Sequence, residues 1–323
     1  MFRKPRFFSR AKGEQMRDSY TSDAPRSDRA DYVGSEGMRH SIRPRRKILL
    51  QAEQRDLTQP QADAAPVAAP AVMRAIDSAV ADPVGRLMPD TNAPRWHDLP
   101  LADIGPNADL FLGDSERDSA AARAFDLLRT RLRQTTLEHG WVNIAVTAPT
   151  SGCGNTFTAA NLALSLSRVA GSRTLLMDFN LRAPGLAQGL DIDAPGDLAD
   201  VLRGDVAMGD HLLRVSDTLA VGLNGHAAPT AAEILQDAST AETLTRMRAA
   251  LRPQIVIYDM PAMLAHDDVS AFLPQLDGVL LVSDGTQTMA RHLIECERML
   301  DGQVPLLGVV LNRARPSSIR RYS

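Results

Sequence analysis

Lysine is almost absent from the sequence. The chain of 323 residues has three lysines, Lys4, Lys12 and Lys47, so no lysine beyond position 47 can contribute charge to a binding site. Cysteine is scarce as well, and the two cysteines, Cys153 and Cys296, do not have metal-ligand spacing. This pattern argues against a disulfide-stabilised scaffold and fits a reducing compartment, so we expect a cytoplasmic protein.

Long apolar runs are also missing. No stretch approaches the roughly 20 residues that a membrane-spanning helix needs. Residues 1–8 contain basic side chains, but no apolar segment follows them, and a signal peptide needs one. The sequence therefore predicts neither a membrane span nor a secretion signal.

Charge is distributed unevenly along the chain. Residues 1–50 carry 13 Lys and Arg against 6 Asp and Glu, a net charge of +7, and because the whole chain has −3, residues 51–323 sum to −10. The basic segment has two interpretations, a contact surface for anionic lipid or an acidic partner and a solvated tail. No nucleic-acid-binding motif accompanies the basic residues, so we expect no nucleic-acid partner.

The composition divides the chain into four parts. Residues 1–92 are rich in Arg, Asp, Ser, Pro and Ala, which predicts a disordered basic tail and a flexible linker. Residues 93–118 place apolar side chains irregularly among Pro and Asp, and predict a strap on the surface of the next part. Residues 119–315 form the predicted folded domain, and residues 316–323 are a short C-terminal tail.

The domain reads as an α/β fold with a doubly wound parallel sheet. Segments of helical apolar spacing alternate with short, almost continuously apolar runs, a pattern typical of a parallel sheet covered on both faces. The predicted strands are 142–146, 174–177, 218–221, 255–258, 279–282 and 306–311, and the predicted helices are 120–137, 156–169, 231–250 and 287–300. Ligands of such folds bind beyond the carboxyl ends of the strands.

A glycine-rich loop follows the first predicted strand. Residues 148–156 read Ala-Pro-Thr-Ser-Gly-Cys-Gly-Asn-Thr and lead into a helix, which is the form of a phosphate-binding P-loop. In such a loop the backbone N–H groups surround the phosphates and a lysine neutralises their charge, but here Asn155 stands at the lysine position. The candidate nucleotide contacts are Ser151, Gly152, Cys153, Gly154, Asn155, Thr156 and Arg182.

Two aspartates end later predicted strands. Asp178 follows the strand 174–177, and Asp259 has the form of the Walker B aspartate of P-loop proteins. Either residue alone could cap a helix or a turn, but their order and spacing after the loop predict a nucleotide-binding fold. We predict Thr156, Asp178 and Asp259 as Mg²⁺ ligands, with the two aspartates as candidate catalytic residues.

The domain resembles the bacterial tyrosine kinases of capsule and exopolysaccharide synthesis, within the partitioning-type P-loop ATPases. The matching segments are Leu-Arg-Thr at 128–130, Ala-Ala-Asn-Leu-Ala at 159–163, Gly225 to Pro229 with Glu-Ile-Leu at 233–235, Asp259, Pro261 and Asp268, and Leu-Gly-Val-Val-Leu-Asn at 307–312. The resemblance implies an ATP-dependent tyrosine kinase that forms a homo-oligomeric ring. It also implies a membrane-embedded polysaccharide chain-length or export protein as the partner, at the inner face of the membrane.

The departures from this family fall on charged positions. Asn155 replaces the lysine, and Asn180 replaces an aspartate that the resemblance implies helps to handle metal and to activate the tyrosine nucleophile. The motif Glu-x-x-Arg-x-x-Arg, implied to build the ring interface, reads Arg-x-x-Asp-x-x-Arg at 123–129, which disfavours ring assembly. Tyr322 stands alone in the tail, where the family has a tyrosine cluster.

We therefore predict a degenerate pseudo-kinase that regulates or scaffolds polysaccharide synthesis and export, and that binds Mg-ATP or Mg-ADP weakly or not at all. One alternative is an active ATPase or tyrosine kinase that uses Arg182 in place of the lysine. Another is a partitioning-type localisation ATPase, although Thr150 occupies the position of the second lysine usual in that class. Cys153 has two interpretations, a reactive thiol at a helix N-terminus and a small residue that fills the loop.

Overall fold

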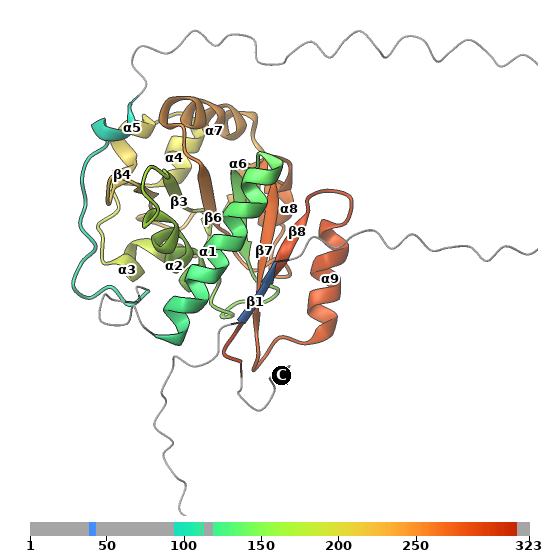
Figure 1. The fold of residues 1–323 in the computed structure, drawn as a ribbon. Helices are drawn as coiled ribbons and strands as arrows, with labels where there is room; N and C mark the ends of the chain where they lie inside the picture. Colours follow the sequence, from blue (N-terminus) through green and yellow to red (C-terminus); the bar gives the residue numbers. More distant parts are fainter. Residues whose placement is uncertain (1–38, 43–93, 111, 113–118, 315–323) are drawn as a thin grey trace, which may run out of the picture. The chain divides into compact units, whose positions relative to one another are not determined.

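A computed structural model of the chain describes residues 39–42, 94–110, 112 and 119–314 (Figure 1). The predicted tail and linker at 1–92 lie outside the described residues except for 39–42, and the C-terminal tail 316–323 lies outside them entirely. Phe111 and residues 113–118 of the predicted strap are also outside.

One eight-stranded sheet organises the domain, in the order β1-β8-β7-β2-β6-β3-β5-β4. The strands are β1 Arg39–Ile42, β2 Asn143–Thr147, β3 Thr174–Asp178, β4 Leu213–Arg214, β5 Leu219–Gly222, β6 Ile255–Asp259, β7 Gly278–Asp284 and β8 Leu306–Asn312. The neighbours from β8 to β5 are all parallel. The predicted parallel sheet is therefore confirmed, and all six predicted strands belong to it.

The two edge strands were not predicted. β1 pairs antiparallel with β8, with Arg39 opposite Leu311, and β4 pairs antiparallel with β5. β1 reads Arg-His-Ser-Ile and β4 has two residues, so neither carries the apolar run that marks the inner strands. Both strands satisfy backbone groups of a neighbour that would otherwise be a free sheet edge.

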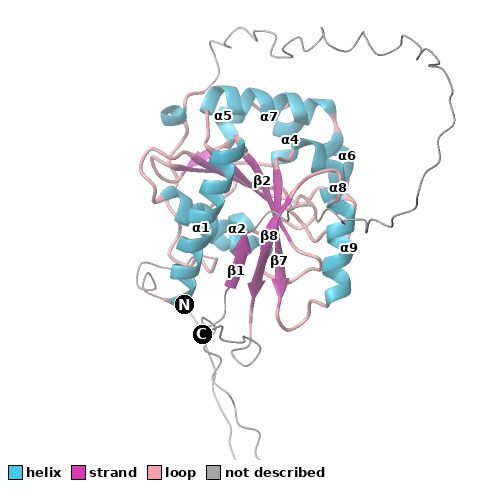
Figure 2. Cartoon of the chain, turned by 45° about the vertical axis from the view of Figure 1, so that its right-hand side comes forward, coloured by secondary structure: helices cyan, strands magenta, loops and turns pink. Residues whose placement is uncertain are grey.

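Helices cover both faces of the sheet (Figure 2). They are α1 Ala120–His139, α2 Asn155–Ser167, α3 Leu186–Leu190, α4 Leu198–Arg203, α5 Met208–His211, α6 Ala231–Gln236, α7 Ala238–Leu251, α8 Asp268–Phe272 and α9 Ala290–Leu300, with 3₁₀ turns η1 Trp96–Asp98 and η3 Leu273–Gln275. The predicted helix 231–250 is two helices, because Asp237 ends α6 and its side chain caps α7 by accepting from the Ser239 N–H at 2.8 Å.

The alternation of side chains along the strands produces two apolar cores. Ile144 and Val146 of β2 face α1 and α2, whereas Ala145 between them faces the core that contains residues of α7, α8 and α9. Short segments at the ends of the strands complete the coverage, and these segments carry the polar residues that the sequence singled out. Because β2, β3, β6 and β7 run parallel, their carboxyl ends lie at the same edge of the sheet.

The described part of the strap packs against the domain. Trp96 is 1% exposed, and its indole Nε1 donates to the Asp217 carbonyl at 2.8 Å. Leu99 is buried, whereas Leu101 is exposed and lies at an isolated bridge with Arg214. Leu112 donates its N–H to the Asn161 side chain of α2 at 3.1 Å, so the strap contacts the domain near both of its ends.

Candidate functional site

The predicted phosphate loop connects β2 to α2. Gly152 and Gly154 have φ values of +79° and +90°, a conformation that favours glycine. A Cβ on Gly154 would also collide with the Asn312 side chain. α2 begins at Asn155, so its free N–H groups point toward the loop. The glycines therefore perform the structural task that the motif predicts.

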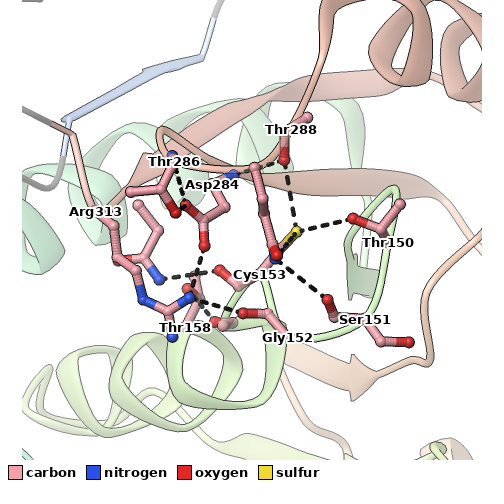
Figure 3. A network of polar contacts seen from close by, with 12 residues as sticks. Thr150, Ser151, Gly152, Cys153, Thr158, Asp284, Thr286, Thr288 and Arg313 are labelled. Atoms are coloured by element: carbon pink, nitrogen blue, oxygen red, sulfur yellow. Dashed lines mark hydrogen bonds and ion pairs between the residues drawn. The ribbon is translucent and has the colours of Figure 1, made fainter.

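Side chains from the ends of β7 and β8 hold the loop from outside (Figure 3). Gln287 donates to the Ser151 carbonyl at 3.2 Å, Arg313 to the Gly152 carbonyl at 2.9 Å, and Asn312 to the Cys153 carbonyl at 3.0 Å. These side chains hold three successive carbonyls. In a planar trans peptide the N–H points opposite to the C=O. The N–H groups of residues 152–154 are therefore directed away from the side chains that bind the carbonyls.

Arg313 does not bring a free charge to the loop. Its Nη1 also lies 2.6 Å from Oδ2 of Asp284, whose side chain is completely buried. Asp284 accepts two further hydrogen bonds from the backbone and hydroxyl of Thr286, at 2.7 and 2.6 Å. Four of these residues were not predicted as site residues, although the run that ends at Asn312 marks the end of β8: Gln287, Asn312, Arg313 and Asp284.

The thiol of Cys153 is fully buried inside the loop. Its sulfur lies 3.5 Å from the Thr150 hydroxyl, the Thr288 hydroxyl and the Gln287 amide. Burial acts to raise its pKa, but hydrogen bonds from these three residues lower the pKa below the usual thiol value. Cys153 therefore links the loop to the segment that follows β7, and it fills the space between them.

Asn155 turns toward the sheet. Its Nδ2 donates to Asp259 Oδ1 at 3.1 Å and to the Met260 carbonyl at 2.8 Å, and the residue is only 9% exposed. Both amide hydrogens are thereby used. The residue at the lysine position is thus a neutral group held by the Walker B segment.

Asp178 and Asp259 lie side by side on neighbouring strands. They are opposite each other in the register of β3 and β6, and neither side chain is exposed. Asp178 Oδ2 accepts from the N–H groups of Gly185 and Leu186 at 3.1 and 3.0 Å. Asp178 Oδ1 and Asp259 Oδ2 are buried with no hydrogen-bond partner among the described residues.

Burial shifts the titration of both carboxyl groups in the same direction. It raises the pKa of Asp178 from 3.8 to about 7, although N–H groups of Leu186, Gly185 and Asn180 oppose the shift. Burial also raises the pKa of Asp259 well above its usual value, the neighbouring Asp178 charge raises it further, and hydrogen bonds from Thr156 and Asn155 act against both. In the described part of the chain, neither carboxylate has an ion pair.

These residues fit a magnesium ion. Two partnerless carboxylate oxygens and the nearby Thr156 hydroxyl are the hard oxygen ligands that Mg²⁺ prefers, with the other positions left to water and phosphate. The described residues contain no cluster of three or more His, Cys, Asp or Glu side chains that could enclose a metal alone. The structure brings together the three predicted metal ligands, Thr156, Asp178 and Asp259.

Arg182 is engaged elsewhere. Its Nε donates to both carboxylate oxygens of Asp268, at 3.0 and 2.9 Å, and its Nη1 donates to the Pro229 carbonyl. The hydrogen bond to buried Asp268 raises the pKa of Arg182 further. The predicted replacement cation is therefore paired with a carboxylate of α8, and its described contacts do not include the loop. Asn180 follows β3 as predicted and is half-buried.

The helix motif expected at the ring interface makes contacts within the domain. Asp126 Oδ1 accepts from Arg129 Nη1 at 2.9 Å and from the Ser165 hydroxyl at 2.8 Å, and it lies 3.5 Å from Arg168 Nη1. Arg129 also donates to the Ser165 carbonyl at 3.2 Å. Asp126 and Arg129 of this motif thus tie α1 to α2.

Comparisons with known proteins agree with this geometry. Residues 144–322 match the model of the CobQ/CobB/MinD/ParA nucleotide binding domain. The chain is 29% identical over 187 residues to the succinoglycan biosynthesis transport protein ExoP of Rhizobium meliloti, which covers 56% of this chain and 23% of ExoP. It is 28% identical over 208 residues to the putative tyrosine-protein kinase EpsB of Ralstonia nicotianae, covering 63% of this chain and 27% of EpsB.

A solved structure supports the same assignment. The kinase domain of VpsO has a TM-score of 0.53 and 25% identity, and the match covers 60% of this chain and 98% of that domain. The comparisons confirm the resemblance to tyrosine kinases of exopolysaccharide synthesis. The chain spans about a quarter of the length of ExoP and of EpsB. In the residues that the structure describes, no helix is long and apolar enough to cross a membrane.

The carboxylate pair predicts an unusual pH dependence. Burial raises the pKa of Asp259 well above its usual value and that of Asp178 to about 7, so between about pH 4 and 7 the folded state holds protons that the unfolded chain has lost, and Asp259→Asn lacks the proton held by Asp259. The free energy of unfolding must then fall as pH rises. The fall is about 1.4 kcal/mol for each pH unit over which the folded state holds one proton more than the unfolded chain. Chemical denaturation without Mg²⁺ should show that the wild type loses unfolding free energy between pH 5.5 and 7.5, relative to Asp259→Asn.

Asp193→Asn, which removes an exposed carboxylate, is the control and should keep the wild-type pH profile. Mg²⁺ added at pH 7.5 should restore stability to the wild type and not to Asp259→Asn. If the pH profiles of the wild type and Asp259→Asn are parallel, the two carboxyl groups do not titrate as described.

Proposed function

The chain belongs to the CobQ/CobB/MinD/ParA nucleotide-binding family, and from this membership we propose that it is a pseudo-kinase that regulates or scaffolds exopolysaccharide synthesis and export. Its relatives include a succinoglycan biosynthesis transport protein and putative tyrosine kinases. The observation that carries the proposal is the contact of Asn155 with Asp259, which replaces a mobile ammonium with a neutral, anchored amide.

Phosphoryl transfer depends strongly on the missing charge. Its catalysis is mostly positioning and electrostatic stabilisation of the transferring group. At the lysine position this chain offers an amide whose two hydrogens already bond to Asp259 and Met260. The nearby guanidinium groups of Arg182 and Arg313 are paired with Asp268 and Asp284. No described cation near the loop is free to replace the lysine without breaking an ion pair.

The rest of the site supports nucleotide binding better than turnover. The N–H groups of the loop and of the first turn of α2 would bind phosphate oxygens, and Thr156, Asp178 and Asp259 would hold Mg²⁺. When bound, Mg²⁺ would neutralise phosphate charge. A charge-assisted contact is worth roughly 1.5–3 kcal/mol, so its loss weakens affinity without abolishing it. We therefore expect a protein that responds to bound nucleotide and hydrolyses it slowly or not at all.

A slow ATPase or kinase is the second candidate function. The presence of all three predicted metal ligands favours this function. Two buried aspartates destabilise the fold, and a protein that had no use for Mg-nucleotide would gain nothing by keeping them. In this case tyrosines of another protein would be the substrate, because the tail offers Tyr322 alone. Tyrosine phosphorylation that depends on Asp259 would identify this function.

The partner is proposed from the relatives. Proteins of exopolysaccharide transport and synthesis match this chain over the P-loop domain, and they extend well beyond it. We infer that this chain works with a membrane-embedded chain-length or export protein, at the inner face of the membrane. The net charge of +7 that the sequence places at 1–50 suits a contact with anionic lipid or an acidic partner.

Restoring the lysine tests the proposal. Calorimetric titration of the full chain with Mg-ATP and Mg-ADP should show weak or undetectable binding in the wild type. Asn155→Lys should bind about 10- to 150-fold more tightly, because the ammonium adds one charge-assisted contact. Asn155→Ala is the matched control, since it removes the same hydrogen bonds without adding charge, and it should show no gain. Equal affinity in Asn155→Lys and the wild type would contradict the proposed role of Asn155.

The contacts of α1 predict the oligomeric state. The wild type should be monomeric by size-exclusion chromatography with light scattering, because Asp126 and Arg129 are used within the domain. The double variant Arg123→Glu, Asp126→Arg restores the family motif and should gain self-association. A stable ring of the wild type would show that the internal contacts open on assembly.

A further inference from the structure

A polar cavity lies at the opposite end of the sheet from the phosphate loop. It has a volume of about 420 Å³. Its wall includes Arg173 directly before β3, Asp217 shortly before β5, Arg252 between α7 and β6, and His97 of the strap. Arg173 and Arg252 precede β3 and β6, whose carboxyl ends carry Asp178 and Asp259. The volume lies within the roughly 300–1,000 Å³ typical of small-molecule sites.

Arg173 is held in a fixed orientation in this wall. Its guanidinium carbon lies 5.5 Å from the centre of the Trp96 ring, and its Nη1 donates to the Leu251 carbonyl at 3.1 Å. Trp96 is itself buried and anchored to the Asp217 carbonyl. A guanidinium has five N–H donors in a planar fork, so most donors of Arg173 are left for another acceptor.

Arg252 occupies a backbone conformation that favours glycine. It is the C-cap of α7 with φ +48°, the position at which glycine most often ends a helix. Its side chain is exposed, and in the described part of the chain its guanidinium makes no hydrogen bond and no ion pair. Arg252 therefore brings to the cavity a guanidinium group that no described carboxylate neutralises.

The charge of the wall is positive. Asp217 is its one acidic residue, and that carboxylate already lies 3.0 Å from Arg214 Nη1. Two guanidinium groups without carboxylate partners therefore face the same cavity, with the exposed imidazole of His97 beside them. Paired guanidinium forks match the several acceptor oxygens of a phosphate group.

We propose that this cavity binds a phosphate monoester, with Arg173 and Arg252 as the phosphate ligands. The volume exceeds what a bare phosphate fills, so an organic group of the size of a sugar is accommodated as well. The same chemistry is offered by a soluble sugar phosphate and by the headgroup of a phosphatidate lipid. The inference is independent of the proposed function, because it involves no residue of the nucleotide site.

Trp96 provides a local reporter. The chain has two tryptophans, so Trp141→Phe leaves Trp96 as the only one, directly beside Arg173. In that background, the fluorescence of the full chain should change saturably on titration with glucose 1-phosphate or with phosphatidate vesicles, and not with glucose. The ligand that produces the change identifies the source of the phosphate.

Arg252→Gly separates binding from folding. Glycine relieves the positive φ, so this variant should melt at a higher temperature than its parent while its affinity falls at least tenfold. Arg291→Ser, which removes an exposed arginine from α9, is the charge-matched control and should leave the affinity unchanged. The proposal is overturned if neither ligand changes the Trp96 signal, if Arg252→Gly binds as its parent does, or if Arg291→Ser weakens binding equally.

Discussion

The hydrogen bond from Asn155 to Asp259 is the interaction on which the chemistry of this protein depends. It joins the residue at the lysine position to one of two carboxylates that are buried on neighbouring strands. Buried carboxylates are costly unless a cation or a proton balances them. An amide satisfies one oxygen but balances no charge. The site can therefore take up a proton or Mg²⁺, and the nearby guanidinium groups of Arg182 and Arg313 are already paired with carboxylates.

The shape of the phosphate loop does not depend on a lysine. Its carbonyls are held by Gln287, Asn312 and Arg313, and its turns by two glycines with positive φ. These contacts come from the ends of β7 and β8, which the sheet fixes. An asparagine at position 155 is therefore compatible with a loop that keeps its support. The chain can thus keep the fold of its family without a lysine at this position.

Most of the fold could be predicted from the sequence, because the inner strands are apolar runs whose period differs from that of the helices. β1 and β4 could not, since each is short and unpatterned and is defined by pairing with a distant strand. That Thr156, Asp178 and Asp259 lie close together was predictable, because parallel strands bring their carboxyl ends together. The hydrogen-bond partners were not predictable: Arg182, a predicted nucleotide contact, meets Asp268, and Asn155 meets Asp259, across long stretches of sequence.

The most direct test of the account is ATP hydrolysis by the purified full chain, measured with Mg²⁺ and compared between the wild type and Asp259→Asn. If the proposed pseudo-kinase function is right, both proteins release phosphate at the same background rate, because the site lacks the charge that phosphoryl transfer requires. Mg²⁺-dependent hydrolysis by the wild type that disappears in Asp259→Asn would contradict it, and would show that the site is catalytically active with Asn155 in place of lysine.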